Sequence, residues 1–295
     1  NADWSAYTNV TFKIVPGAVI SRGAFTVNIP NPDSGATVYQ WLSGTGAVTF
    51  SGTVDKVYPD WFAVNTAPGT TSMRAAIDSA MASLSSIGGV VQFLPVAYDY
   101  PRASTGAVVN NLVSNLTIQG VPGKTILTNS TNNNNLYVSI FQGVGLSNIT
   151  IKDLSVSGAA LVLFQTCTDV LVENVMSNGK AGTNNFAERG ITINNTMRAK
   201  VDKVNFKNHA FHVHIGNDTV GTSNDVKVTN SSFENTELST DATNPVGVYV
   251  FYGNGVLVDG CTFTNILPDT VAHAGYGVYE GDGESNDVTV VNCKF

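Results

Sequence analysis

The sequence is poor in charged residues, in cysteine and in long apolar runs. Only 13% of its 295 residues are charged, and the formal net charge is -7. Nucleic acid or an anionic membrane would need a basic face, so neither partner is expected. No apolar run approaches the roughly 20 residues that a membrane-spanning helix requires. The three cysteines do not show a metal-binding spacing such as Cys-x-x-Cys, so no metal or other cofactor is expected.

One short pattern returns six times in the second half of the chain. Its first position is apolar in every copy: Ile149, Val170, Ala199, Val226, Val256 and Val288. The third position is aliphatic throughout, and the fifth is Asn, Asp, Gly or Lys: Asp153, Asn174, Lys203, Asn230, Gly260 and Asn292. These fifth positions are between 21 and 32 residues apart, a period typical of solenoids.

The pattern predicts a corner between two short strands in each copy. Positions one and three share one face of a strand, because strand side chains alternate between faces. Asn, Asp and Gly tolerate the left-handed backbone of a sharp bend, which places the corner at position five. Position eight should then stack at roughly 4.8 Å per copy, and it is mostly Phe: Val156, Ser177, Phe206, Phe233, Phe263 and Phe295. We therefore expect an all-β chain of stacked parallel strands.

Three parts are expected along the chain. Residues 1–62 are predicted to be a β-rich lead-in, and residues 63–89 a linker and a helix that covers the first turn of the coil. Thr71 or Ser72 is the expected helix cap, and Gly88 with Gly89 the expected stop. Residues 90–295 form the coil. Because the sequence ends within a repeat, at Phe295, the coil is expected to be truncated there.

Four segments together carry a family resemblance. They are Val57-Tyr58-Pro59-Asp60-Trp61-Phe62, the helix around Arg74-Ala75-Ala76-Ile77, the run from Gly88 to Pro95, and Asn115-Leu116-Thr117-Ile118-Gln119-Gly120. Their order resembles the pectate-lyase-like right-handed β-helix superfamily, and most closely its bacterial extracellular proteins and phage tailspikes. The resemblance implies a single-stranded right-handed parallel β-helix, a polysaccharide partner and an extracellular location, either secreted or on a virion. Tailspikes in this superfamily are parallel homotrimers, so it also makes a homotrimer an assembly to test.

Histidines and aromatic residues mark the candidate site. We align Gly190-Ile191-Thr192-Ile193, His212-Val213-His214-Ile215, Tyr249-Val250-Phe251-Tyr252 and Gly277-Val278-Tyr279-Glu280 as neighbouring strands. If the aliphatic residue in second place faces inward, the outward strip is Thr192, His212, His214, Tyr249, Phe251 and Tyr279. Exposed rings of this kind indicate an interaction surface, and ring faces suit sugars.

Two cleavage chemistries fit these residues. For β-elimination in an acidic polysaccharide, His212 or His214 is the candidate base, Tyr249 the acid and Arg189 the group that neutralises the carboxylate. Lys207 and His209 belong to a basic stretch that suits an anionic glycan. A hydrolase would instead need two carboxyl groups, for which the candidates are Glu188, Glu237 and Glu280.

A binding role without catalysis is the competing hypothesis. The chain would then be a glycan-binding or structural spike or adhesin, and the histidines would be ordinary strand residues. A His pair two residues apart, without a third ligand, does not make a metal site. Asn217-Asp218 and Asp282-Gly283-Glu284 look like calcium loops, but each leads into a new repeat, which favours ordinary turns.

Overall fold

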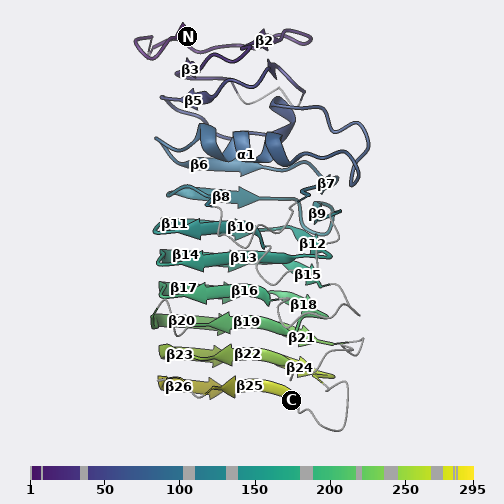
Figure 1. Cartoon of the computed structure of the whole chain (residues 1–295), viewed down its shortest axis with the longest axis vertical. Helices are drawn as coiled ribbons and strands as arrows, with labels where there is room; N and C mark the ends of the chain where they lie inside the picture. Colours follow the sequence, from purple (N-terminus) through teal and green to yellow (C-terminus); the bar gives the residue numbers. More distant parts are fainter. Residues whose placement is uncertain are drawn as a thin grey trace.

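The computed structural model is an elongated coil in which parallel strands stack along one long axis (Figure 1). It describes residues 2–7, 9–33, 39–101, 110–130, 139–179, 189–216, 221–235, 245–266, 275–281, 283 and 285–295. Within these residues, every strand pairing of the named sheets is parallel, and the chain is a right-handed parallel β-helix, as predicted.

Three long sheets form the coil in the described part of the chain. The six-stranded sheet contains β10 (Ser139–Val144), β13 (Ala160–Gln165), β16 (Arg189–Asn194), β19 (Phe211–Ile215), β22 (Val246–Val250) and β25 (Tyr276–Glu280). The eight-stranded sheet contains β6 (Gly89–Gln92), β8 (Leu116–Gln119), β11 (Ser147–Lys152), β14 (Thr168–Glu173), β17 (Met197–Asp202), β20 (Ser223–Thr229), β23 (Gly253–Asp259) and β26 (Asn286–Val291). The seven-stranded sheet contains β7 (Ala97–Asp99), β9 (Ile126–Thr128), β12 (Ser155–Ser157), β15 (Met176–Asn178), β18 (Asn205–Lys207), β21 (Ser232–Glu234) and β24 (Thr262–Thr264).

The predicted corners join the eight-stranded sheet to the seven-stranded sheet. All six fifth positions have a left-handed backbone, with φ between 51° at Asn174 and 64° at Gly260. The asparagine side chains among them bond to the neighbouring rung: the Asn174 amide donates to Asp153 at 2.7 Å, and the Asn230 amide donates to Asp202 at 2.9 Å. The corner column therefore serves both the bend and the stacking, which confirms the sequence prediction.

Aliphatic and phenylalanine columns fill the interior. The first and third positions of the repeat pair in register along the eight-stranded sheet, for example Val170 with Ala199 and Val172 with Val201. The eighth position stacks as predicted. Phe233 lies 5.3 Å from Phe263, centroid to centroid. This shared register lets each rung bury its apolar face against the next one.

The helix α1 (Arg74–Ser83) lies above β6 at the start of the coil (Figure 1). Its apolar face is buried as expected, and the Gly88 N–H donates to the Leu84 carbonyl at 2.8 Å, which ends the helix. The predicted cap is wrong: the N-cap residue is Met73, without a side-chain cap, while the Thr71 hydroxyl accepts from the Ala67 N–H. None of the described helices is long and apolar enough to cross a membrane.

The lead-in is also built from stacked parallel strands. β1 (Ala2–Asp3), β3 (Val27–Ile29) and β5 (Val48–Phe50) form one sheet, and β2 (Ile20–Ser21) and β4 (Leu42–Ser43) form another. The 3-10 turn η1 (Pro59–Trp61) follows, and a parallel bridge between Val57 and Val91 joins the lead-in to the coil. The lead-in thus continues the stack of the coil.

Candidate functional site

The outer face of the six-stranded sheet carries the candidate site. Four of the expected residues form one column across adjacent strands: Thr192, His214, Tyr249 and Tyr279. Tyr249 lies between Val248 and Val250, both buried in the core, so its own side chain points to the opposite, outer face. The expected alignment of β22 is off by two residues, because Val248 and not Val250 pairs with Val213. Tyr249 therefore neighbours His214 rather than His212.

Five half-buried rings gather on this face, and we call them the aromatic cluster: Phe211, Tyr249, Phe251, Tyr276 and Tyr279. The Tyr249 ring is their centre. Its centroid lies 5.2 Å from Phe211, 5.8 Å from Phe251 and 5.5 Å from Tyr279, and the planes of Tyr249 and Tyr279 differ by only 10°. Phe211 and Tyr276 were not among the residues expected from the sequence. Both begin a strand and share one register with Arg189 through Val246, but each directly precedes an aligned four-residue segment, so the alignment did not include them.

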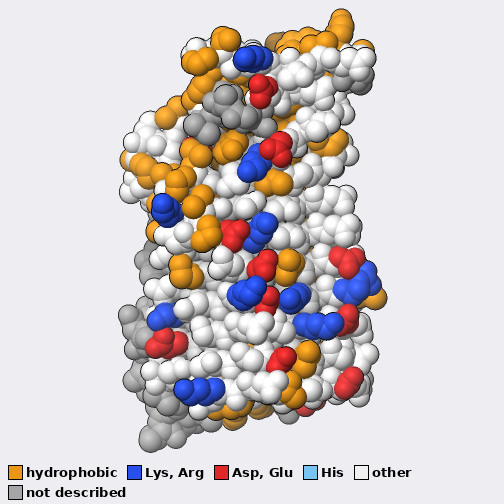
Figure 2. All heavy atoms as spheres, turned by 180° about the vertical axis from the view of Figure 1, so that it is seen from behind, with side chains coloured by type: hydrophobic (Ala, Val, Ile, Leu, Met, Phe, Trp, Pro, Cys, Tyr) orange, Lys and Arg blue, Asp and Glu red, His pale blue; other side chains and the backbone are white. Residues whose placement is uncertain are grey.

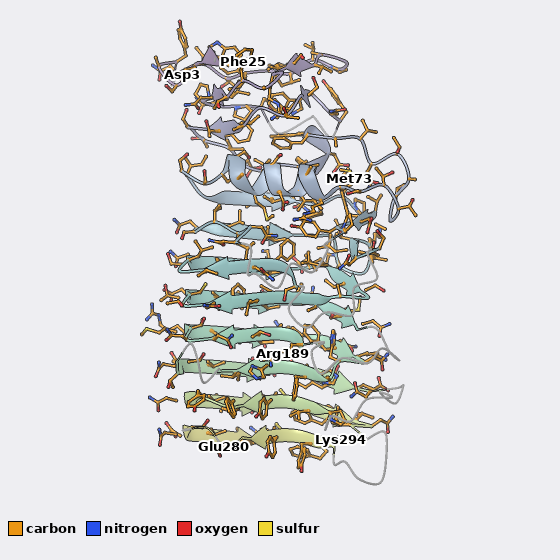
Figure 3. The ribbon with its side chains drawn as sticks, viewed as in Figure 1. Asp3, Phe25, Met73, Arg189, Glu280 and Lys294 are labelled. Atoms are coloured by element: carbon orange, nitrogen blue, oxygen red, sulfur yellow. The ribbon has the colours of Figure 1, made fainter. Side chains whose placement is uncertain are left out.

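Arg189 and His214 adjoin the aromatic cluster. The Arg189 guanidinium carbon lies 5.8 Å from the Phe211 ring centroid, and the His214 ring lies 5.1 Å from that of Tyr249 (Figure 3 labels Arg189 in the middle of the coil). His214 is buried, with 3% of its surface exposed, and its Nδ1 has no hydrogen-bond partner among the described residues. Burial, and then the nearby charge of Arg189, hold the His214 pKa well below its usual value, so the ring is neutral at pH 7.

His212 is not on the outer face, which corrects the sequence prediction, and His209, expected in a basic stretch that suits an anionic glycan, is not exposed either. Both are buried inside the coil, where the His212 ring packs 5.6 Å from Phe233. The strand begins with a bend, so position 212 faces the phenylalanine column and not solvent. Glycine occupies the equivalent position in β16, β22 and β25. A Cβ added to Gly247 would lie 2.4 Å from the Phe263 ring, which shows how closely that column approaches.

The remaining candidates lie elsewhere. Lys207 is on the seven-stranded sheet and pairs with Glu234, at 2.7 Å from Nζ to Oε2. Glu280 is on the last rung (Figure 3), in register with Val250, so it points away from the face that carries Tyr279. Glu280 therefore does not face the aromatic cluster, although the sequence made it a candidate carboxyl group of the site. Glu188 and Glu237 lie outside the described residues, as does most of the two calcium-like loops.

The basic stretch that was expected to attract an anionic glycan is largely neutralised. Arg198 pairs with Asp169 at 2.6 Å, and Lys200 pairs with Asp202 at 3.3 Å, both on the eight-stranded sheet. Figure 2 shows basic and acidic side chains interspersed over the face opposite to the view of Figure 1. This face does not present a field of one sign.

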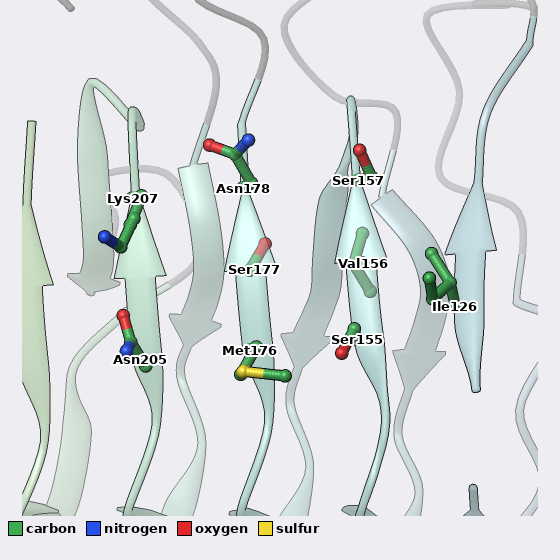
Figure 4. Close-up of a pocket in the computed structure, with 9 residues that line it drawn as sticks. All are labelled: Ile126, Ser155, Val156, Ser157, Met176, Ser177, Asn178, Asn205 and Lys207. Carbon is green, nitrogen blue, oxygen red and sulfur yellow. The ribbon is translucent and has the colours of Figure 1, made fainter. Parts of the chain in front are cut away.

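A shallow hollow of about 290 Å³ opens on the outer side of the seven-stranded sheet (Figure 4). Exposed Met176 and Ile126 border it together with short polar side chains and Lys207. This hollow is on a different sheet from the aromatic cluster. Among the described residues, no group of three or more His, Cys, Asp or Glu side chains could hold a metal ion. The chemistry that the described residues offer is therefore ring stacking, one cation and one neutral imidazole, all around Tyr249.

Known proteins resemble this chain in structure but not detectably in sequence. No protein-family model matches it, and no curated protein does. The surface adhesin PfbA of Streptococcus pneumoniae has a TM-score of 0.58 at 16% identity, with 81% of this chain and 70% of that chain covered. The ORF18 protein of Geobacillus virus E2 has a TM-score of 0.52 at 15% identity, over 81% of this chain. The match covers 52% of the virus protein, so the chain spans about half of its length. At these identities the similarity establishes the fold alone.

Proposed function

We propose that the protein binds an extracellular polysaccharide along the outer face of its six-stranded sheet. The observation that carries this proposal is the aromatic cluster, five half-buried rings centred on Tyr249. A group of rings left partly in solvent on a rigid sheet supports an interaction surface. Tyrosine combines an apolar ring with a hydroxyl, which matches the alternating apolar and hydroxyl faces of a sugar.

The ligand class follows from the groups around the rings. Arg189 is a permanent cation beside Phe211, and guanidinium groups bind carboxylates through paired hydrogen bonds. This favours a polysaccharide with acidic sugars. PfbA is a surface adhesin, and ORF18 is a virus protein, so two proteins with this fold come from settings where a cell-surface glycan would be met.

Cleavage by β-elimination is the second candidate function. Arg189, His214 and Tyr249 are contiguous, and together they supply a cation, a neutral imidazole and a phenol. Such groups could neutralise a uronate carboxylate, accept the C5 proton and protonate the leaving oxygen. His214 takes the role of base in place of His212, which lies inside the coil. Hydrolysis has less support, because Glu280 points away from the rings.

The wider assignments are proposals of the same kind. We place the chain in the pectate-lyase-like superfamily, among bacterial extracellular proteins and phage tailspikes, on the strength of the sequence resemblance. An extracellular location, on a secreted protein or a virion, follows from this placement. A homotrimer is the assembly that a tailspike would adopt, and light scattering at increasing concentration would test it.

The test is binding to a panel of acidic and neutral polysaccharides by isothermal titration calorimetry or a glycan array. Tyr279→Ala should weaken binding at least tenfold, because it removes one of the stacked rings. Lys227→Ala is the matched control, since it changes an exposed side chain on the eight-stranded sheet. Ultraviolet absorbance of unsaturated sugars and product size, measured in parallel, distinguish cleavage from binding. Equal binding by both variants would contradict the proposal.

A further inference from the structure

Three of the four histidines of the chain lie within a six-residue stretch, and all three are buried. His209 precedes β19, and His212 and His214 are within it, with exposed fractions of 1%, 0% and 3%. A buried imidazole is stable only while it is neutral, unless an opposite charge or several hydrogen bonds compensate for its protonation. The folded form of this stretch therefore requires the three imidazoles to be neutral.

His209 and His212 form a pair inside the corner between β18 and β19. Their ring centroids are 5.7 Å apart, and the rings of Phe206 and Phe233 pack against the pair. The Nε2 atom of His209 lies 2.9 Å from the Ser177 hydroxyl, and its Nδ1 has no partner among the described residues. One proton on either ring would thus be placed close to a second imidazole and among aromatic carbons.

His212 also connects two strands of the next rung. Its Nδ1 lies 3.1 Å from the Val246 carbonyl oxygen, and its Nε2 lies 3.3 Å from the Glu234 carbonyl oxygen. Val246 begins β22 and Glu234 ends β21, so this one ring spans both ends of the segment between them. A neutral imidazole donates only one hydrogen bond, so just one of the two contacts is a bond at neutral pH.

The described residues around the pair bring no negative side chain to compensate a proton. His209 and His212 face each other, Ser177 on β15, the two phenylalanine rings and the Asn235 side chain. Glu234 presents its carbonyl oxygen, while its carboxylate pairs with Lys207 at 2.7 Å. On the other side of β19, His214 faces Arg189, a like charge once the imidazole is protonated.

We propose that mild acid opens the coil locally at the rung of β19, with His209 and His212 as the groups that take up protons. The opening separates β19 from its neighbours β16 and β22, and leaves the rungs between β8 and β14 closed. It needs no ligand and holds whether or not the outer face binds a polysaccharide. Since Phe211 is on the same strand, acid would also loosen the aromatic cluster.

Proton linkage gives the direction and the pH range. Burial lowers the pKa of His212 to about 4, against the 6.5 of an exposed histidine, and burial next to His212 holds the pKa of His209 well below its usual value. Above pH 6.5 both the closed and the open forms are neutral, and the equilibrium does not depend on pH. As the pH falls from 6.5 to 4, the open form takes up protons first, so closure is progressively lost. At pH 5, His212 alone should raise the opening constant about 30-fold.

Hydrogen–deuterium exchange of the unmodified protein tests this without any substitution. Protection factors, corrected for the intrinsic exchange rate, are compared at pH 7.5 and pH 5 for peptides covering 205–215 and 147–156. We expect protection in 205–215 to fall at least 30-fold, by the linkage above, and protection in 147–156 to stay constant. Unchanged protection in 205–215, or an equal fall in both segments, would overturn the proposal.

Two variants identify the group that titrates. His212→Gln and His209→Gln should each reduce the pH dependence, because glutamine can bond to a carbonyl oxygen and does not titrate. The double variant should abolish most of it. Glu234→Gln is the matched control, since it removes the carboxylate that pairs with Lys207 and keeps the backbone carbonyl near His212. It should keep the full acid response. A full acid response in both single histidine variants, or its loss in Glu234→Gln, would contradict the assignment.

Discussion

The phenylalanine column makes a quantitative prediction about stability. Phe233 is fully buried, and its ring lies 5.3 Å from Phe263 and 5.6 Å from His212. Replacement by alanine removes the ring contacts and leaves a cavity that the rungs on either side hold open. Such a change costs about 3–5 kcal/mol in a packed core, and ring pairs add about 0.5–1.5 kcal/mol beyond the buried area. Phe233→Ala should therefore destabilise the coil by about 4 kcal/mol.

Phe295 provides a control within the same column. It stacks on Phe263 at 5.1 Å with an interplanar angle of 11°, but 73% of its surface is exposed. Because little of this ring is removed from water, Phe295→Ala should cost less than about 1 kcal/mol. Urea unfolding followed by far-ultraviolet circular dichroism measures both variants, and Phe233→Leu should recover most of the loss. Equal losses for Phe233→Ala and Phe295→Ala would refute the reasoning that burial in the stack determines the stability.

Two further substitutions test the corner and the crowded strand start. Asn230→Ala should lose about 2 kcal/mol, because alanine is strained at φ 51° and the bond to Asp202 disappears; Asn230→Gly should lose only about half as much, as measured by urea unfolding. Gly247→Ala should cost about 1–3 kcal/mol, since its Cβ would lie 2.4 Å from the buried Phe263 ring. Gly277→Ala, whose added Cβ would meet the exposed Phe295 ring, should lower the melting temperature less than Gly247→Ala does. A larger drop for Gly277→Ala would show that the space around these two glycines does not determine the loss of stability.

The coil was predictable because its repeat is short and its columns are chemically distinct. Alternating aliphatics fix the inner face, and a left-handed corner needs Asn, Asp or Gly, so Asn174 and Asn230 identify the bend without a structure. Lys203 adopts the same conformation, with φ 53°, and its place in the register, rather than its residue type, reveals it. The helix position was also readable, but its cap was not, because no side chain caps it.

The site was only partly predictable, for two physical reasons. A slip of two residues along a strand keeps every side chain on its own face, so the alternation of apolar residues could not detect the misplacement of Tyr249. The face of His212 depends on the bend at the start of β19, which alternation ignores. The sequence did contain one sign that the position of His212 lies against packed rings. The neighbouring strands have glycine there, at Gly190, Gly247 and Gly277.

The central claim is that the aromatic cluster is the polysaccharide-binding surface. The most direct measurement is the affinity of the intact protein and of Tyr279→Ala for the best polysaccharide of the panel, by isothermal titration calorimetry at pH 7.5, with Lys227→Ala as control. A loss of at least tenfold, about 1.4 kcal/mol, is expected for Tyr279→Ala alone, with both variants folded as judged by circular dichroism. Full affinity in Tyr279→Ala, or no binding of any polysaccharide by the intact protein, would contradict it.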